Sequence, residues 1–136
     1  MRICVIYSKG SSPKKSLKLV SSFIKGLEEQ ANTVDFFDIS QKKDCNALLY
    51  DYIAIGSSNF PLFGKKVDPV LKSFLQQTSH LSGKRSFAFT TKRIFGVNKV
   101  LQAIMQKMEE QGMFVTFSEI FKDEISAKEI GKNLVG

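Results

Sequence analysis

Short apolar runs alternate with amphipathic stretches along this chain, and the alternation predicts its elements. The first run covers residues 1–7 and is nearly all apolar from Ile3 onward, which is typical of a strand inside a sheet. A second strand is predicted at residues 33–39, where the aspartates favour an exposed edge position. Three more strands are predicted at residues 53–55, 84–91 and 113–121.

Amphipathic segments between these runs predict helices. Ser12 and Pro13 suit the N-cap and first position of one helix, which would end near Gln30, and Asp68 and Pro69 repeat that pattern for another. Two further helices are predicted at residues 97–110 and 124–135, whereas residues 41–49 predict only a turn or two. The predicted apolar faces are Val20, Phe23, Ile24 and Leu27; Val70, Leu71, Phe74 and Leu75; Val97, Val100, Leu101, Ile104 and Met108; and Ile125, Ile130 and Leu134.

Strands that alternate with helices indicate an α/β fold with a parallel sheet. We therefore expect residues 1–136 to form a single domain, a three-layer sandwich around a five-stranded parallel sheet. With strand order 2-1-3-4-5, the loops after strands one, three and four meet at the topological switch point, where ligands bind in such sheets.

Composition limits the classes of function that the chain can have, but it does not select one of them. The chain has 20 lysines and arginines against 13 acidic residues, a net charge of +7, which indicates either a solvated lysine-rich surface or affinity for an anionic ligand or partner. No apolar run approaches the roughly 20 residues of a membrane span, and no signal peptide is expected. Cys4 and Cys45 have neither metal-site nor disulfide spacing, so a cytoplasmic protein with reduced thiols is expected.

Three loops carry the candidate chemistry. The small-residue loop from Ser8 to Ser12 enters a helix N-terminus, where free N–H groups and the helix dipole favour a phosphate. The loop after strand three carries Phe60 and Phe63, against which a flat ring could stack. The loop after strand four offers hydroxyls and cations. Each loop also has a purely structural interpretation: a capped turn, packed aromatic rings, or the end of a strand.

The stretch YDYIAIGSSNF…GKKVDPVLKSFL resembles the third strand, flavin-flanking loop and following helix of the flavodoxin-like family of FMN proteins. KRSFAFTT resembles the family's fourth strand and the start of its second flavin loop. The resemblance implies the flavodoxin-like strand order and one- or two-electron transfer through FMN. The implied cofactor-binding residues are Ser8, Lys9, Gly10, Ser11, Ser12 and Lys14 in the phosphate loop; Ser57, Ser58, Asn59, Phe60, Phe63 and Gly64 beside the ring; and Thr90, Thr91 and Lys92 near its pyrimidine edge.

The chain departs from the family's pattern in three respects. The phosphate loop reads SKGSSPK, with Pro13 at a position where the family has threonine, so one N–H donor is missing. The second flavin loop has Lys92 and Arg93 in place of an aromatic or glycine-rich stretch, and cations there would raise the flavin's potential. Carriers of this family are commonly acidic, whereas this chain is basic.

Two functions follow as hypotheses. The first is a flavodoxin-like FMN protein in electron transfer or simple oxidoreduction, with a redox partner protein or a small-molecule acceptor, so whether the chain is an enzyme stays open. The alternative is a flavin-free module of this fold that binds an anionic partner, protein or nucleic acid, of which nucleic acid is less favoured. A response-regulator receiver shares the strand order but needs a phosphoacceptor aspartate where this chain has Gly56 and Ser57.

Overall fold

The structure is a computed structural model that describes residues 1–10, 13–41, 45–58, 68–93 and 96–134. Within these ranges it contains strands and helices in strict alternation, with one short 3₁₀ helix before the third strand. The elements are β1 (Arg2–Ser8), α1 (Pro13–Glu29), β2 (Thr33–Asp38), η1 (Ala47–Leu49), β3 (Tyr52–Ser57), α2 (Pro69–Gln77), β4 (Arg85–Thr91), α3 (Val97–Glu110), β5 (Phe114–Phe121) and α4 (Glu124–Asn133).

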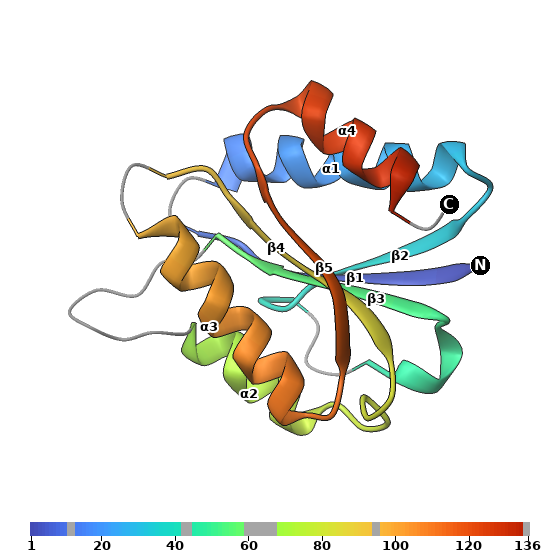
Figure 1. Ribbon diagram of the computed structural model, residues 1–136, viewed down its shortest axis with the longest axis vertical. Helices are drawn as coiled ribbons and strands as arrows, with labels where there is room; N and C mark the ends of the chain where they lie inside the picture. The colour runs from blue at the N-terminus through green and yellow to red at the C-terminus, as the bar shows by residue number, and fades with distance from the viewer. Residues whose placement is uncertain (11–12, 42–44, 59–67, 94–95, 135–136) are drawn as a thin grey trace.

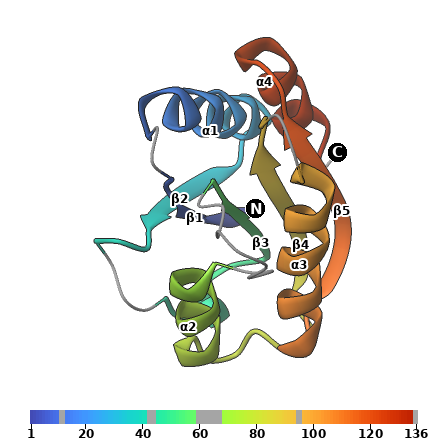
Figure 2. The same ribbon diagram turned by 90° about the vertical axis from the view of Figure 1, so that its left-hand side faces the viewer.

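The five strands form one parallel sheet in the order β2-β1-β3-β4-β5, as the sequence predicts. The strand with the aspartates, β2, lies at one edge of the sheet, and β5 lies at the other. Helices α1 and α4 cover one face, and α2 and α3 cover the other (Figures 1 and 2). The three-layer α/β sandwich is therefore confirmed.

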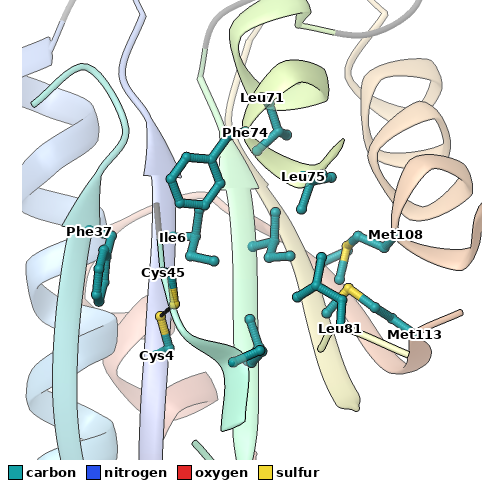
Figure 3. Close-up of a cluster of buried hydrophobic side chains, with 14 of the residues drawn as sticks. Cys4, Ile6, Phe37, Cys45, Leu71, Phe74, Leu75, Leu81, Met108 and Met113 are labelled. Carbon is teal, nitrogen blue, oxygen red and sulfur yellow. Dashed lines mark hydrogen bonds between the residues drawn. The ribbon is translucent and has the colours of Figure 1, made fainter. Parts of the chain in front are cut away.

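Each face of the sheet has its own apolar core. Under α1 and α4, Phe23 packs against Phe87 and Phe121, with ring centroids 5.3 and 5.0 Å apart. Under α2 and α3, Ile53 and Ile55 of β3 pack with aliphatic and sulfur-containing side chains (Figure 3). Strands β1, β3 and β4 are buried on both faces because each lies between two neighbours and under helices on both sides, which explains their nearly continuous apolar runs.

The element boundaries agree with the predicted ones to within a few residues, but two predicted core positions are wrong. Val70 on α2 is 49% exposed and Ile125 on α4 is 81% exposed. Both lie in the first turn of a short helix. The predicted turn or two before β3 is the single 3₁₀ turn Ala47–Leu49.

Asp68 is the N-cap of α2 and Pro69 its first residue, as predicted, and the Asp68 side chain accepts a hydrogen bond from the backbone N–H of Val70. The equivalent N-cap prediction for Ser12 lies outside the described residues. Among the residues that the structure describes, no helix is long and apolar enough to cross a membrane.

Candidate functional site at the carboxyl edge of the sheet

The carboxyl ends of β1, β3 and β4 line up at one edge of the sheet. Ser8 is the register partner of Ser57, and Ser57 is the register partner of Thr90, so the three side chains form a row across three adjacent strands. The backbone N–H of Ser58 donates to the carbonyl of Ser8 at 2.8 Å, which extends the pairing of β1 with β3 beyond the last strand residue. The residues at which the three predicted loops begin therefore lie together.

A buried carboxylate lies behind this row. Asp68 is only 2% exposed, and its Oδ2 accepts hydrogen bonds from the hydroxyls of both Ser8 and Ser57, the latter at 3.0 Å. Its Oδ1 accepts the N–H of Val70 at 2.9 Å. One side chain thus links the ends of β1 and β3 to the start of α2. A buried carboxylate needs several such donors, because its desolvation is otherwise costly.

A second chain of hydrogen bonds crosses the same edge. The hydroxyl of Tyr7 donates to Ser58 Oγ at 2.6 Å, and Ser58 Oγ lies 2.6 Å from Thr91 Oγ1. Burial raises the pKa of Tyr7 above its ordinary value, although its hydrogen bonds with Ser58 and Ser16 oppose the shift. Thr90 donates to the carbonyl of Ser57 at 2.7 Å. The strand ends are therefore held together by side chains as well as by the backbone.

These contacts give five predicted site residues partners within the protein. Ser8, Ser57, Ser58, Thr90 and Thr91 are all buried, and each hydroxyl has a partner within the protein. Their side chains hold the loop ends in place. A ligand here would meet the backbone and the neighbouring loop residues first. Sequence reasoning missed Asp68 as the acceptor, although three serines and two threonines at strand ends are a signal that a buried acceptor is required.

The remaining predicted residues fall into two groups. Lys9 forms an ion pair with Asp38 at 3.6 Å, Gly10 is half-buried, and Lys14 and Lys92 are exposed. Lys14 lies in the first turn of α1, beside the edge at which the three strands end. The predicted residues that lie outside the described part of the chain are Ser11, Ser12, Asn59, Phe60, Phe63 and Gly64.

A hollow of about 620 Å³ opens next to this edge, between α1, the end of β4 and the start of α4. Two of its lining residues, Thr91 and Lys92, belong to the predicted site. Five cationic and two acidic side chains line it, namely Lys15, Lys18, Lys92, Arg93 and Lys122 against Asp123 and Glu124. The hollow is therefore a basic surface that adjoins the carboxyl edge.

Solved structures resemble this architecture along nearly its whole length. The flavodoxin of Megasphaera elsdenii in its two-electron reduced form aligns with a TM-score of 0.73 at 18% identity, covering 96% of each chain. The chain has the flavodoxin-like fold. Oxidised flavodoxin 1 of Bacillus cereus aligns with a TM-score of 0.69 at 14% identity, covering 96% of this chain and 95% of that one.

The flavodoxin-like fold also includes an NAD(P)H:quinone oxidoreductase from Methanothermobacter marburgensis, which aligns with a TM-score of 0.65 at 14% identity, covering 100% of this chain and 96% of that chain. Neither a protein-family model nor a curated protein sequence matches the chain. Identities this low establish the flavodoxin-like fold alone.

Proposed function

We propose that this chain, as a single domain of residues 1–136, binds FMN at the carboxyl edge of its sheet and serves in electron transfer or simple oxidoreduction. The observation that carries the proposal is the row formed by Ser8, Ser57 and Thr90, which brings the starts of three loops to one point. That point is the switch point of the strand order, where ligands bind in such sheets. Flavodoxins share this architecture over nearly their full length.

The described residues suit the phosphate end of FMN. The N-terminus of the 17-residue helix α1 lies at the carboxyl edge, and aligned peptide dipoles favour an anion there. Lys14 is exposed in its first turn and can add a compact positive charge. Pro13 cannot donate an N–H, so this charge supplies part of what the loop lacks.

When bound, FMN would supply the one- or two-electron chemistry, and the protein would supply orientation and electrostatics. Asp68 and its two serine donors would keep the phosphate loop and the loop beside the ring at a fixed separation. Lys92 is exposed directly after β4, where its charge would favour the reduced, more negative flavin and raise the reduction potential.

The deciding experiment is a fluorescence titration of FMN against the purified apo-protein, with riboflavin as the matched ligand that lacks the phosphate. We expect FMN fluorescence to be quenched on binding, with FMN clearly preferred over riboflavin. Equal affinity for the two would contradict the phosphate assignment, and binding of neither would contradict the cofactor.

Variants localise the site. Lys14→Ala should weaken FMN binding roughly two- to fivefold and leave riboflavin binding unchanged, since an exposed pair of opposite charges contributes up to about 1 kcal/mol. Lys25→Ala, an exposed lysine farther along the same helix, is the control and should change neither affinity. Ser12→Ala should weaken FMN binding, and Phe60→Ala should also alter the quenching of its fluorescence.

The basic hollow favours a second function, that of a flavin-free module which binds an anionic partner. Among the described residues, the lysines of the hollow form no ion pair. The backbone N–H of Ser126 lowers the pKa of Asp123, and the Ser126 side chain and Lys92 contribute less to this shift. Asp123 is engaged as the N-cap of α4 at 2.7 Å from the Ser126 nitrogen. The hollow therefore carries four lysines against two acidic side chains.

Salt dependence tests this alternative. Binding of a labelled acidic peptide and of a labelled single-stranded oligonucleotide would be measured across a salt series in the absence of flavin. Lys18→Glu combined with Lys122→Glu should weaken binding and flatten the dependence of log K on log salt. Lys72→Glu, on the opposite face of the sheet, is the control. Binding that none of these substitutions changes would exclude the hollow.

A further inference from the structure

Two cysteine sulfurs meet in the core on the α2–α3 side of the sheet. Cys4 Sγ, on β1, lies 3.6 Å from Cys45 Sγ, which belongs to the segment before η1 (Figure 3). The two residues are 41 positions apart in the chain, and neither is in a disulfide. The fold therefore brings together two thiols whose spacing in the sequence does not predict a contact.

The distance between the two sulfur atoms is only slightly longer than a disulfide bond. A sulfur–sulfur bond is about 2.0 Å long, so the two atoms need to approach by roughly 1.5 Å. Side-chain rotation and a slight shift of the Cys45 segment can supply this movement, since Cys45 lies outside the regular strands and helices. Cys4, by contrast, is held in the middle of a strand that is paired on both sides.

The two thiols differ in accessibility. Cys4 is completely buried, whereas Cys45 is 7% exposed. Both belong to the same apolar cluster, with Phe37, Ile39 and Tyr50 around them. Cys45 is therefore the residue of the pair nearer to solvent, and its sulfur lies 3.6 Å from that of Cys4.

We propose that Cys4 and Cys45 are a redox-active dithiol, which a hydroperoxide oxidises to an intramolecular disulfide. The Cys45 thiolate attacks one peroxide oxygen, the O–O bond breaks, and a sulfenic acid and an alcohol or water result. Cys4 then attacks the Cys45 sulfur, the S–O bond breaks, and water leaves as the S–S bond forms. Two electrons pass from the two thiols to one peroxide, and the two thiol protons end in the released alcohol or water molecules.

The disulfide would have a defined structural effect. It would join the middle of β1 to the segment that enters β3 and close a loop that contains α1 and β2. A cross-link across a loop of this length raises thermal stability mainly by restricting the unfolded chain. The inference does not depend on flavin binding, because the pair lies in the core of the sheet and away from the carboxyl edge.

The test uses the folded, full-length protein. Reduced protein is treated with equimolar hydrogen peroxide, unreacted peroxide is removed, and thiols are counted after denaturation. We expect both thiols to be lost together, the monomer to become lighter by two hydrogen atoms, and dithiothreitol to restore both. Thermal unfolding should shift upward by about 10 °C on oxidation. Retention of both thiols, or formation of a disulfide-linked dimer in place of the monomer product, would overturn the proposal.

Single variants test the order of the two steps. In Cys4→Ala the sulfenic acid on Cys45 has no internal thiol to react with, so dimedone should label it. Cys45→Ala leaves only the completely buried Cys4 and should be labelled at least tenfold less. Circular dichroism confirms that each variant is folded before oxidation. Stronger labelling of Cys45→Ala than of Cys4→Ala would overturn the assignment of Cys45 as the attacking thiol.

Discussion

Gly26 of α1 lies directly against Gly131 of α4. A Cβ atom on Gly131 would lie 3.1 Å from the Cα of Gly26 and 2.2 Å from the carbonyl oxygen of Phe23. A Cβ atom on Gly26 would lie 2.1 Å from the carbonyl oxygen of Lys128. The backbones of the two helices are therefore in contact, which lets both lie flat on the same face of the sheet (Figure 2).

Gly26→Ala should lower the free energy of unfolding by roughly 1–3 kcal/mol, because the helices must move apart to admit the methyl group. Without the close contact, the same substitution would stabilise the protein, because alanine is a better helix former than glycine by about 1 kcal/mol. The direction of the change therefore reports on the contact. Urea unfolding measures the change. Ser21→Ala, on the exposed side of α1, should stay within about 0.5 kcal/mol of the parent. A stabilised Gly26→Ala protein would contradict the close contact.

Gly56 is required by an aromatic ring of the neighbouring strand. A Cβ atom at this position would lie 2.2 Å from Cε2 of Phe89. Gly56→Ala should therefore cost roughly 1–3 kcal/mol, and the same substitution in a Phe89→Leu background should cost clearly less. A double-mutant cycle measured by chemical unfolding gives the coupling. If the costs of Gly56→Ala and Phe89→Leu simply add, the Phe89 ring is not what requires glycine at position 56.

Asp68 is expected to contribute more to the free energy of unfolding than an ordinary helix cap does. Asp68→Ala removes the cap and leaves the buried hydroxyls of Ser8 and Ser57 without their acceptor, at a cost of about 2–4 kcal/mol. Asp68→Asn keeps an acceptor and should cost less.

Asp123→Ala is the matched control for Asp68→Ala, because Asp123 caps α4 with its side chain exposed. It should cost about 1 kcal/mol. Equal costs at the two positions, measured by urea unfolding, would show that the serine contacts add nothing to the cap.

Alkaline pH should destabilise the protein through its buried tyrosines. Burial raises the pKa of Tyr7 and of Tyr52 above the ordinary value of about 10. Above about pH 10 the unfolded chain loses these protons first, so the folded state binds more protons and stability falls as the pH rises towards the folded-state pKa. Below that pH the contribution is fully present.

Tyr7→Phe tests this dependence. It removes one titrating group, so the free energy of unfolding should fall less steeply with pH between about 9.5 and 11 than in the parent. Its stability at neutral pH is lower for a separate reason, the lost hydrogen bond to Ser58. The slope, rather than the absolute value, is therefore the readout, and an unchanged slope would contradict the shift.

Local patterns determined the architecture of this protein. Continuous apolar runs at β1 and β3 reflect burial on both faces of a parallel sheet, and apolar residues at helical spacing determine which side of α1 and α3 packs inward. The pair Asp68–Pro69 specified where α2 begins, because N-cap chemistry depends only on neighbouring residues. Fold class and most boundaries therefore followed from local patterns, and the strand order followed from the resemblance to the flavodoxin-like family.

The candidate site could be predicted only as a location. Sequence reasoning brought Ser8, Ser57 and Thr90 to one edge, since parallel strands end together. It assigned these residues to a ligand, and the structure adds that each of the three hydroxyls donates a hydrogen bond within the protein. The partner of Ser8 and Ser57 is Asp68, which lies in a later element of the chain and is brought to them only by the fold.

Tertiary structure alone decided the contacts between distant residues. The carboxylate of Asp68 meets Ser8 from 60 positions away, the thiols of Cys4 and Cys45 meet across 41 positions, and Gly26 meets Gly131 from another part of the chain. Periodicity records which face of an element is buried, because burial repeats with the helix or strand. It carries no record of which atoms meet on that face, because this depends on how the helices and strands are packed in three dimensions.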